Sequence, residues 1–281
     1  MNQPFVGDPF QVLPDTHVVP TYWPVPGLGT IPMNAFVLRA AEPVLVDTGV
    51  GILSDEFLSA LGEVVDPADL RWIWLTHEDR DHTGSLARLL ELAPRATVLG
   101  TFMTFGRAAP DGPLPPERTQ IVNPGDTVHV GDRVLQAVRP PLFDSPGTLG
   151  FLDRSTGAYV SSDCFGAPLP ADLVTADTTE HVDPEVLRAA QVAWATADSP
   201  WVTSADGDAL RAQVETVRRM DPSLLLSSHL PPVRRGIDHT LDAVLAAREA
   251  DPTPGPTQEQ IEALLADFAP GEDTTSERNT A

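Results

Sequence analysis

The stretch THEDRDHTGSL, residues 76–86, follows directly on an apolar run at residues 71–76, RWIWLT. A run this short indicates a buried strand rather than a helix. The stretch then offers four candidate metal ligands within six residues, namely His77, Asp79, Asp81 and His82. A tight loop could turn several of these side chains inward; one metal ion cannot easily take all four, but two neighbouring ions can share them. The stretch therefore predicts a pair of metal ions at the end of a strand, where α/β folds place their ligands.

A simpler interpretation of the same stretch is a charged surface segment that opens a helix, because acidic side chains interact favourably with the start of a helix. The residues from Gly84 to Leu92 do predict a helix, since Leu86, Leu89 and Leu90 share one face. The stretch alone does not decide between these interpretations, so the decision depends on the rest of the chain.

Three further polar residues lie at the ends of predicted strands or at turns. Asp163 closes the strand predicted for residues 158–162, and His229 closes the apolar run at residues 224–228. Asp144 precedes a Pro-Gly turn. Each of them alone is an ordinary turn residue, cap or hydrogen-bonding side chain. Their value lies in the combination, because the chain now has four segments that place polar groups beside strand ends.

The order of the predicted elements indicates a layered fold of helices and strands. Two hairpins are predicted at residues 127–138 and 148–162. Helices are predicted over residues 184–197, 208–220 and 238–250, and an earlier one with Ser54 as its N-cap. Residues 168–183 are polar and predict an irregular insertion over one face. This order is compatible with two β-α halves packed face to face, which periodicity alone does not establish.

Five motifs, in this order along the chain, resemble those of the metallo-β-lactamase superfamily. They are VLVDTG at 44–49, THEDRDHTGSL at 76–86, DSPGTLGFLD at 144–153, YVSSDCFG at 159–166 and LLLSSHLPP at 224–232. The resemblance extends from about Asn34 to Arg235, and joint matches are far more specific than any single motif. It implies an α+β protein with the four-layer αβ/βα sandwich of that superfamily.

The resemblance also implies a role for each residue of the site. The first metal ion would have His77, Asp79 and Asp144, the second Asp81, His82 and His229, and Asp163 would bridge the two. Asp81 would in addition orient the reacting nucleophile, as the catalytic residue. Asp47 would support the ligand loop by accepting hydrogen bonds from its backbone or its imidazoles.

Two positions depart from the superfamily pattern, because Asp79 and Asp144 stand where histidines are usual. The resulting set of four carboxylates and three imidazoles favours iron, with zinc or manganese as the alternatives. A carboxylate at position 79 resembles the flavodiiron proteins and the related single-domain oxygen-binding diiron proteins, whose loop is H-x-E-x-D. The phrase SSDCFGA also resembles their S-S-D-A-F-G. That branch has Glu at the first position and keeps His at the second, so a weakened or empty first site is left open.

The composition excludes some classes of function. The formal net charge is −22, from 40 acidic and 18 basic residues, and every basic residue is Arg. A surface this acidic repels phosphate backbones, so nucleic acid is not expected as a partner. The single cysteine, Cys164, cannot form an internal disulfide. The N-terminus lacks the features of a signal peptide, and no window approaches the roughly 18 apolar residues of a membrane span. We therefore expect a cytoplasmic protein without membrane contact.

The expected organisation is one metallo-β-lactamase-like domain over residues 1–250, followed by residues 251–281 as a short helix and an acidic, disordered tail. The short helix is predicted at Gln258–Phe268, and disorder at Gly271–Ala281. Since no flavodoxin domain is recognised after the metal-binding motifs, electrons would have to come from a separate redox partner. A homodimer is left open.

Three functions compete on this evidence. The first is a diiron oxidoreductase or oxygen-binding protein that takes O₂ or NO at the metal pair. The second is a hydrolase that uses a metal-bound hydroxide on a small ester, lactone, thioester or phosphoester substrate. The third is a sensor without enzymatic activity, if the replaced histidines cost metal affinity. The oxygen-rich donor set ranks the first narrowly above the second.

Overall fold

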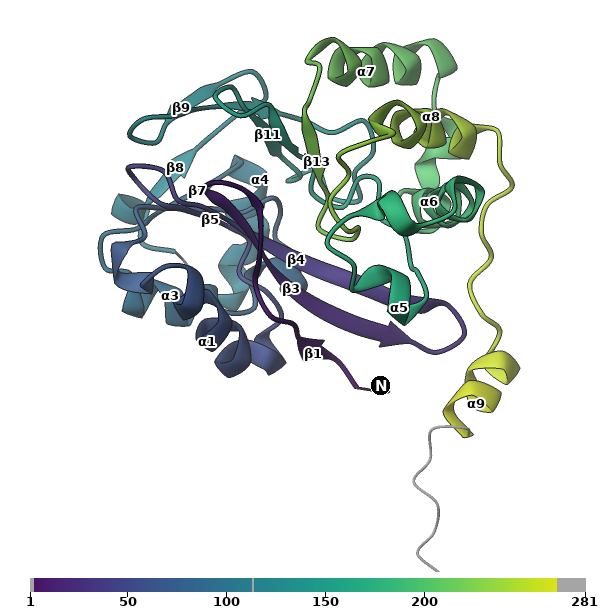
Figure 1. The fold of residues 1–281 in the computed structure, drawn as a ribbon, viewed down its shortest axis with the longest axis horizontal. Coiled ribbons are helices and arrows are strands. Elements are labelled where there is room, and N and C mark those ends of the chain that lie inside the picture. The colour runs from purple at the N-terminus through teal and green to yellow at the C-terminus, as the bar shows by residue number, and fades with distance from the viewer. Residues whose placement is uncertain (1–2, 113, 267–281) are drawn as a thin grey trace, which may run out of the picture.

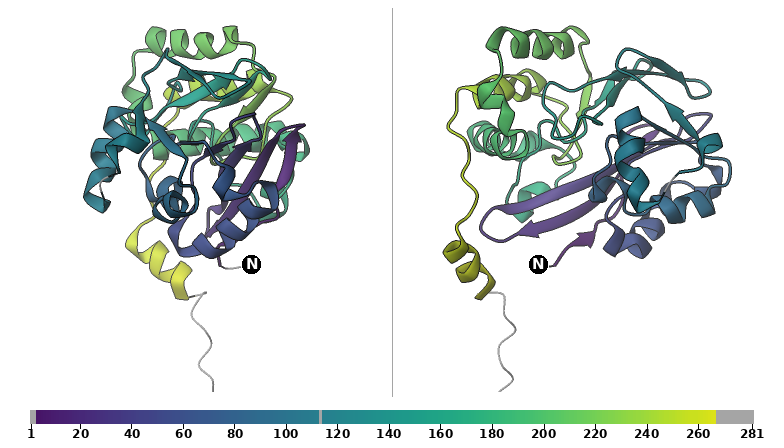
Figure 2. Two further views of the ribbon diagram at one scale, coloured as in Figure 1. Left: turned by 90° about the vertical axis from the view of Figure 1, so that its left-hand side faces the viewer. Right: turned by 180° about the vertical axis from the view of Figure 1, so that it is seen from behind.

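The computed structural model describes residues 3–112 and 114–266. Within them, the strands form one sheet of eight and one of five strands. The sheets lie face to face, and helices cover the outer face of each (Figure 1). Figure 2 shows the same two helical layers on opposite sides of the molecule when it is seen from behind. The predicted four-layer αβ/βα sandwich is confirmed.

The first sheet changes from antiparallel to parallel pairing along its width. Its strands are β1 (Phe5–Val6), β2 (Phe10–Leu13), β3 (Thr16–Val25), β4 (Gly29–Leu38), β5 (Val44–Val46), β6 (Trp72–Trp74), β7 (Thr97–Gly100) and β8 (Thr119–Ile121). Pairing is antiparallel from β1 to β5 and parallel from β5 to β8. Both faces of a parallel sheet are covered, and this explains why β5 and β6 are continuous apolar runs.

The second sheet contains the two predicted hairpins. Its strands are β9 (Thr127–His129), β10 (Val134–Val138), β11 (Gly150–Asp153), β12 (Ala158–Val160) and β13 (Leu224–Leu226). The pairs β9–β10 and β11–β12 are antiparallel, as predicted, and β13 joins β12 in parallel. The strands β12 and β13 therefore end at the same edge of the sheet, and this brings Asp163 and His229 together.

Helices pack in two groups on the outside of the sandwich. The helices of the described residues are α1 (Ser54–Val64), α2 (Arg80–Thr83), α3 (Leu86–Leu92), α4 (Phe102–Ala108), α5 (Ala171–Val174), α6 (Pro184–Asp198), α7 (Gly207–Arg219), α8 (Ile237–Arg248) and α9 (Gln258–Ala266). Phe57, Leu61 and Leu89 bury α1 and α3 against the first sheet, whereas Val214 and Leu241 bury α7 and α8 against the second. Figure 1 shows α1 and α3 on one side and α6, α7 and α8 on the other.

A third cluster of buried apolar side chains lies between the two sheets and joins them. Trp74 of β6 and Phe151 of β11 meet edge to face with their ring centroids 4.7 Å apart. The indole nitrogen of Trp74 donates a hydrogen bond of 2.8 Å to the carbonyl of Leu149. Trp74 is thus a core residue, as its place on a predicted strand indicates, and its polar atom is satisfied.

Some local predictions were wrong. Ser54 is the first residue of α1 and makes no cap hydrogen bond, because the short 3-10 helix Gly51–Leu53 runs directly into α1. The segment expected as a tight loop contains one helical turn, α2, from Arg80 to Thr83. The insertion at 168–183 is not wholly irregular, since it holds α5. The predicted tail helix is present as α9, while the predicted disorder of 271–281 falls outside the described residues.

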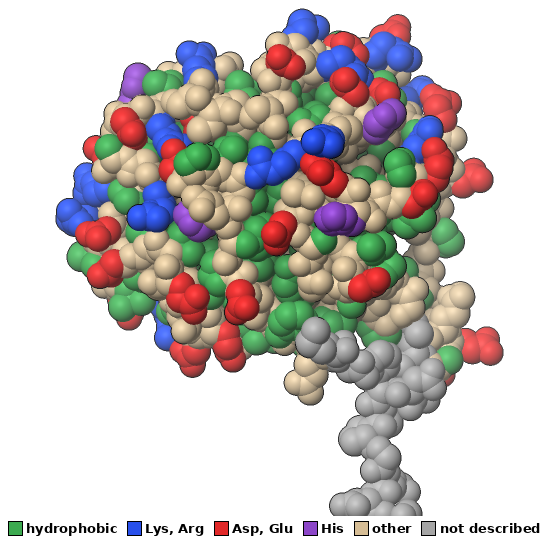
Figure 3. Space-filling view, viewed as in Figure 1, with side chains coloured by type: hydrophobic (Ala, Val, Ile, Leu, Met, Phe, Trp, Pro, Cys, Tyr) green, Lys and Arg blue, Asp and Glu red, His purple; other side chains and the backbone are tan. Residues whose placement is uncertain are grey.

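Two further features are the distribution of charged side chains on the surface and the apolar character of the helices. On the face shown in Figure 3, acidic side chains and Arg side chains are interspersed rather than gathered into a broad basic patch. Across residues 3–112 and 114–266, no helix has both the length and the apolar character that crossing a membrane requires.

Candidate metal centre

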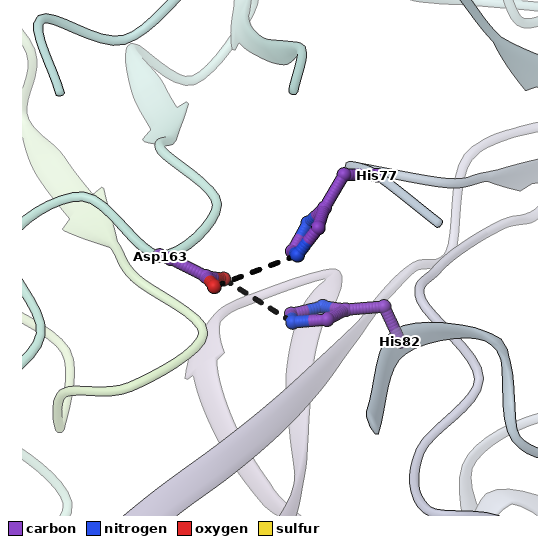
Figure 4. A group of neighbouring side chains, drawn as sticks. All are labelled: His77, His82 and Asp163. Carbon is purple, nitrogen blue, oxygen red and sulfur yellow. Dashed lines mark ion pairs between the residues drawn. The ribbon is translucent and has the colours of Figure 1, made fainter. Parts of the chain in front are cut away.

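Asp163 occupies the middle of the candidate site, with one carboxylate oxygen toward each of two groups of ligands. Its Oδ2 lies 3.5 Å from Nε2 of His77, and its Oδ1 lies 3.2 Å from Nε2 of His82 and 3.3 Å from Nε2 of His229. Figure 4 shows Asp163 entering from one half of the molecule and both His77 and His82 from the other. This is the arrangement that a carboxylate bridging two cations requires.

The first group joins the ligand segment to the turn that carries Asp144. Nε2 of His77 lies 3.9 Å from Oδ2 of Asp79 and 3.8 Å from Oδ2 of Asp144, and one ligand atom from each of the three residues fits within 4.8 Å of the others. The side chain of His77 is fully buried, whereas that of Asp79 is 50% exposed. Asp144 therefore faces the site, a point that the sequence left undecided.

The second group is more deeply buried. Oδ2 of Asp81 lies 3.2 Å from Nε2 of His82 and 3.5 Å from Nε2 of His229. Ligand atoms of these three residues also lie within 4.8 Å of one another. The structure thus brings together all seven side chains that the sequence assigned to the metal ions, in the two predicted groups.

The outer nitrogen of each imidazole is engaged, and this sets which nitrogen faces the centre. Nδ1 of His229 lies 2.8 Å from the carbonyl oxygen of Pro32, and a carbonyl can only accept, so this Nδ1 carries the proton. Nδ1 of His82 lies 2.8 Å from Oδ2 of Asp47. Nδ1 of His77 lies 3.2 Å from the hydroxyl of Ser162. A proton fixed on Nδ1 leaves the Nε2 lone pair available to a metal ion.

Asp47 holds the ligand segment in place, as predicted. Besides its contact with His82, it accepts a hydrogen bond from the backbone N–H of Thr76 and one from the hydroxyl of Thr76, each of 2.8 Å. It also adopts a left-handed backbone conformation with φ of 59°, as does Ser162 with φ of 56°. Side chains other than glycine rarely adopt this conformation, and such positions cluster at functional sites.

Several buried polar atoms of the centre have no hydrogen-bond partner. They are Nε2 of His77, Nε2 of His82 and Oδ1 of Asp163. Buried polar groups are normally paired, because leaving one unpaired is costly. All three atoms point into the same space between the two halves of the molecule. Unpaired imidazole nitrogens and carboxylate oxygens at such spacing are the donors of a metal site, so these residues fit a pair of cations.

The electrostatics of the metal-free chain show how strongly the carboxylates attract positive charge. Burial alone would lower the pKa of His229, but the carboxylates of Asp163 and Asp81 outweigh burial and raise the pKa to about 9. Burial likewise would raise the pKa of Asp163, but the imidazoles, His229 foremost, hold it well below its usual range. Protons on the imidazoles thus balance the carboxylates where cations would otherwise do so.

Two residues near the centre were missed by the sequence analysis, and both lie on α6. The indole nitrogen of Trp194 donates a hydrogen bond of 3.0 Å to the carbonyl of Asp163, and its ring lies 4.8 Å from that of His229. Asp198 is the last residue of α6 and lies beside Asp144 and Asp163. Burial, followed by the charges of Asp163 and Asp144, raises the pKa of Asp198 to about 7. Neither residue lies at the end of a predicted strand, so no local pattern marks either one as part of the site.

Comparison with known proteins places this geometry in context. Over 153 residues the chain is 29% identical to a protein named as a diflavin flavoprotein from Synechocystis sp., covering 54% of this chain and 26% of that protein. It is 28% identical over 134 residues to an anaerobic nitric oxide reductase flavorubredoxin of Salmonella typhi, covering 47% of this chain and 28% of that protein. The aligned part thus spans about a quarter of the length of these curated relatives.

Solved structures and a family model agree with these relatives. The rubredoxin oxygen:oxidoreductase of the anaerobe Desulfovibrio gigas shares the fold with a TM-score of 0.74 at 18% identity, over 86% of this chain and 61% of that one. The family model described as ODP family beta lactamase matches residues 31–229, which is well over half of the chain and includes every residue of the two ligand groups. The chain therefore belongs to the ODP family of beta lactamases.

Proposed function

We propose that this chain holds two iron ions at the candidate metal centre and serves as an oxidoreductase-type protein acting on O₂ or NO. The observation that carries the proposal is the cluster of four carboxylates and three imidazoles centred on Asp163, in which several buried donor atoms make no hydrogen bond. The names of two similar proteins, a nitric oxide reductase and an oxygen:oxidoreductase, support the same class of substrate.

The donor set supports iron in particular. Carboxylate oxygens suit iron and manganese better than zinc, whose sites are richer in nitrogen and sulfur. His77, Asp79 and Asp144 would hold one ion, Asp81, His82 and His229 the other, and Asp163 would bridge them. When bound, a reduced iron pair supplies electrons and open coordination positions for a diatomic molecule.

The chain's own residues would set the geometry of this chemistry. Asp47 and the carbonyl of Pro32 fix the imidazoles of His82 and His229, so that each Nε2 faces the centre. Trp194 packs against the ring of His229 and would restrict the access of water from the α6 side. Asp81 lies beside Nε2 of both His82 and His229. It is therefore the carboxylate best placed to orient a reacting group between the two imidazoles.

The reaction also consumes protons, and it consumes electrons that must be returned to the iron pair before the next turnover. Reduction of two NO molecules to N₂O and water consumes two electrons and two protons, and reduction of O₂ to two water molecules consumes four of each. We propose that a separate redox protein supplies the electrons.

Iron loading tests the proposal. The full chain is reconstituted with Fe²⁺ without oxygen and then exposed to one equivalent of NO or O₂, while its absorption and Mössbauer spectra are recorded. We expect both spectra to change for the wild-type chain, and a much smaller change for His82→Ala. A wild-type protein that takes up only zinc, or an iron-loaded reduced protein whose spectra stay constant with both gases, would contradict it.

Hydrolysis is the alternative that the same experiment should include. Zinc-, manganese- and iron-loaded protein is mixed with a panel of lactones, thioesters and phosphoesters. Because the donor set is rich in oxygen, we expect no turnover that depends on His82. Metal-dependent turnover of an ester by the wild-type chain, lost in His82→Ala, would favour the hydrolase instead.

A further inference from the structure

Asp198 lies at the candidate metal centre, although it belongs to none of the five sequence motifs. It is the last residue of α6, and the hydroxyl of the next residue, Ser199, donates a hydrogen bond of 3.2 Å to its Oδ2. One turn earlier on the same helix, the indole nitrogen of Trp194 donates a hydrogen bond to the backbone carbonyl of Asp163. The helix is therefore anchored on the bridging residue itself, and its end reaches the centre.

The position of Asp198 relative to the other carboxylates is close. One oxygen from each of Asp144, Asp163 and Asp198 lies within 4.8 Å of the other two. Asp144 and Asp163 both also face Nε2 of His77, at 3.8 and 3.5 Å. Asp198 thus approaches the centre beside the bridging Asp163 and beside Asp144, the carboxylate that stands in place of an imidazole in the first group.

Three carboxylates at this spacing repel one another unless positive charge lies among them. The side chain of Asp163 is only 6% exposed, so solvent does little to relieve the repulsion there. Nε2 of His77 faces Asp144 and Asp163, is buried and makes no hydrogen bond. A cation on this side of the centre accounts for all of these groups together, whereas a surface cluster of acids would leave the buried atoms unexplained.

We propose that Asp198 is a further ligand of the first metal ion, in addition to His77, Asp79, Asp144 and Asp163. The inference rests on the proposed dinuclear centre and adds to it a ligand supplied by α6. It gives the first ion a set of one imidazole and four carboxylates, which is harder than that of the second ion. Consequently the two metal sites differ in their ligands, and the first site favours the ion with the stronger preference for oxygen ligands.

The test compares Asp198→Asn with Asp208→Asn in the full chain. Asp208 lies in the first turn of α7, is exposed, and loses the same charge on substitution. Mn²⁺ binding is measured by equilibrium dialysis, and ⁵⁷Fe-loaded protein is measured by Mössbauer spectroscopy. We expect Asp198→Asn to weaken the binding of one ion by at least about tenfold and to shift the spectrum of one iron only. Asp208→Asn should bind both ions as the wild type does.

Circular dichroism shows whether Asp198→Asn is folded, and Asp198→Glu provides a second variant if it is not. The Glu variant retains the carboxylate on a longer side chain, so we expect its affinity for the first ion to lie between those of the wild type and Asp198→Asn. Unchanged affinity and spectra in a folded Asp198→Asn would overturn the inference and leave the dinuclear proposal standing. A wild-type chain that never takes up a second ion would overturn both.

Discussion

At the scale of single residues, the centre depends on hydrogen bonds that fix side chains before any metal ion arrives. Asp47 connects two residues of the ligand segment, because it accepts hydrogen bonds from the backbone N–H and the hydroxyl of Thr76 and contacts Nδ1 of His82. Its left-handed backbone stores strain that a stable surrounding must offset. A residue that is both strained and bonded in this way is expected to matter more for the geometry of the site than for the core.

Asp47→Asn tests this role. The amide keeps the size of the side chain but removes the charge that holds the Nδ1 proton of His82, so the imidazole loses its fixed orientation. We expect the affinity for the second metal ion to fall by about ten- to a hundredfold. Dialysis against Mn²⁺ measures the loss, and Asp208→Asn again serves as the control. Wild-type affinity in a folded Asp47→Asn variant would show that His82 is oriented by other contacts.

The titration of the centre predicts how stability depends on pH once metal ions are removed. The pKa of His229 is raised to about 9 from 6.5. Its contribution to the stability of the metal-free fold is therefore complete below pH 6.5 and is lost as the pH rises toward 9. The pKa of Asp198 is raised to about 7 from 3.8, so its ionisation also destabilises the fold as the pH rises from about 4 to 7. The lowered pKa of Asp163 changes the stability of the fold only below about pH 4, which is outside the pH range over which Asp198 and His229 titrate.

Melting temperatures of chelator-treated and metal-loaded chain, recorded from pH 5 to pH 9, check this prediction. We expect the metal-free chain to melt at progressively lower temperature as the pH rises. The difference from the metal-loaded chain should widen, because cations replace the lost protons. His229→Gln should make the metal-free profile flatter. A metal-free chain that gains stability toward pH 9 would contradict the assignment of His229 to the carboxylate cluster.

At the scale of elements, the ligand segment is held by close backbone packing as well as by hydrogen bonds. The N–H of Gly84, the residue after α2, donates to the carbonyl of Gly49 over 2.9 Å. A Cβ atom at Gly84 would lie 2.1 Å from the backbone nitrogen of Gly51. The turn after β5 and the turn after β6 thus approach each other so closely that only glycine fits, and this contact fixes α2 beside Asp47.

Gly84→Ala should therefore destabilise the fold and disturb the centre together. The added methyl group meets backbone rather than a flexible side chain, and overpacking of this kind costs at least about 1–3 kcal/mol. Gly62→Ala is the matched control, because Gly62 lies within α1 and a Cβ there meets nothing within 4 Å. That control should gain about 0.5–1 kcal/mol from better helix propensity. Urea unfolding of both variants measures the difference, and equal stability would show that the two turns can separate freely.

At the scale of the whole molecule, the sequence predicted the layers and most of the centre because both follow local rules. Strands of a parallel sheet are short apolar runs, and ligands at their ends, such as Asp163 and His229, stand in fixed order after them. The two hairpins and the helices over residues 184–220 were predicted from turn signals and periodicity. The assignment of metal roles to individual residues remains a prediction, as does the domain boundary at residue 250.

The parts that escaped prediction depend on contacts between distant segments. Asp198 and Trp194 reach the centre because α6 packs against α8 and donates hydrogen bonds from Gln191 and Trp194 to the loop after β12. Nothing in their local sequence differs from an ordinary helix end. The helical turn α2 replaces an expected loop, because Gly49 and Thr48 bond to Gly84 and His82 across the two turns. Local patterns report where a strand ends; they do not report which helix packs over that end.

We propose that side chains from both halves of the molecule hold a pair of cations and that Asp163 bridges the two. The metal content of the wild-type chain and of Asp163→Asn, after reconstitution with Fe²⁺ without oxygen and removal of free metal, tests it most directly. We predict two ions per wild-type chain and the loss of at least one in the variant, with Asp208→Asn unaffected. Less than one ion per wild-type chain, or full occupancy of a folded Asp163→Asn, would contradict the account.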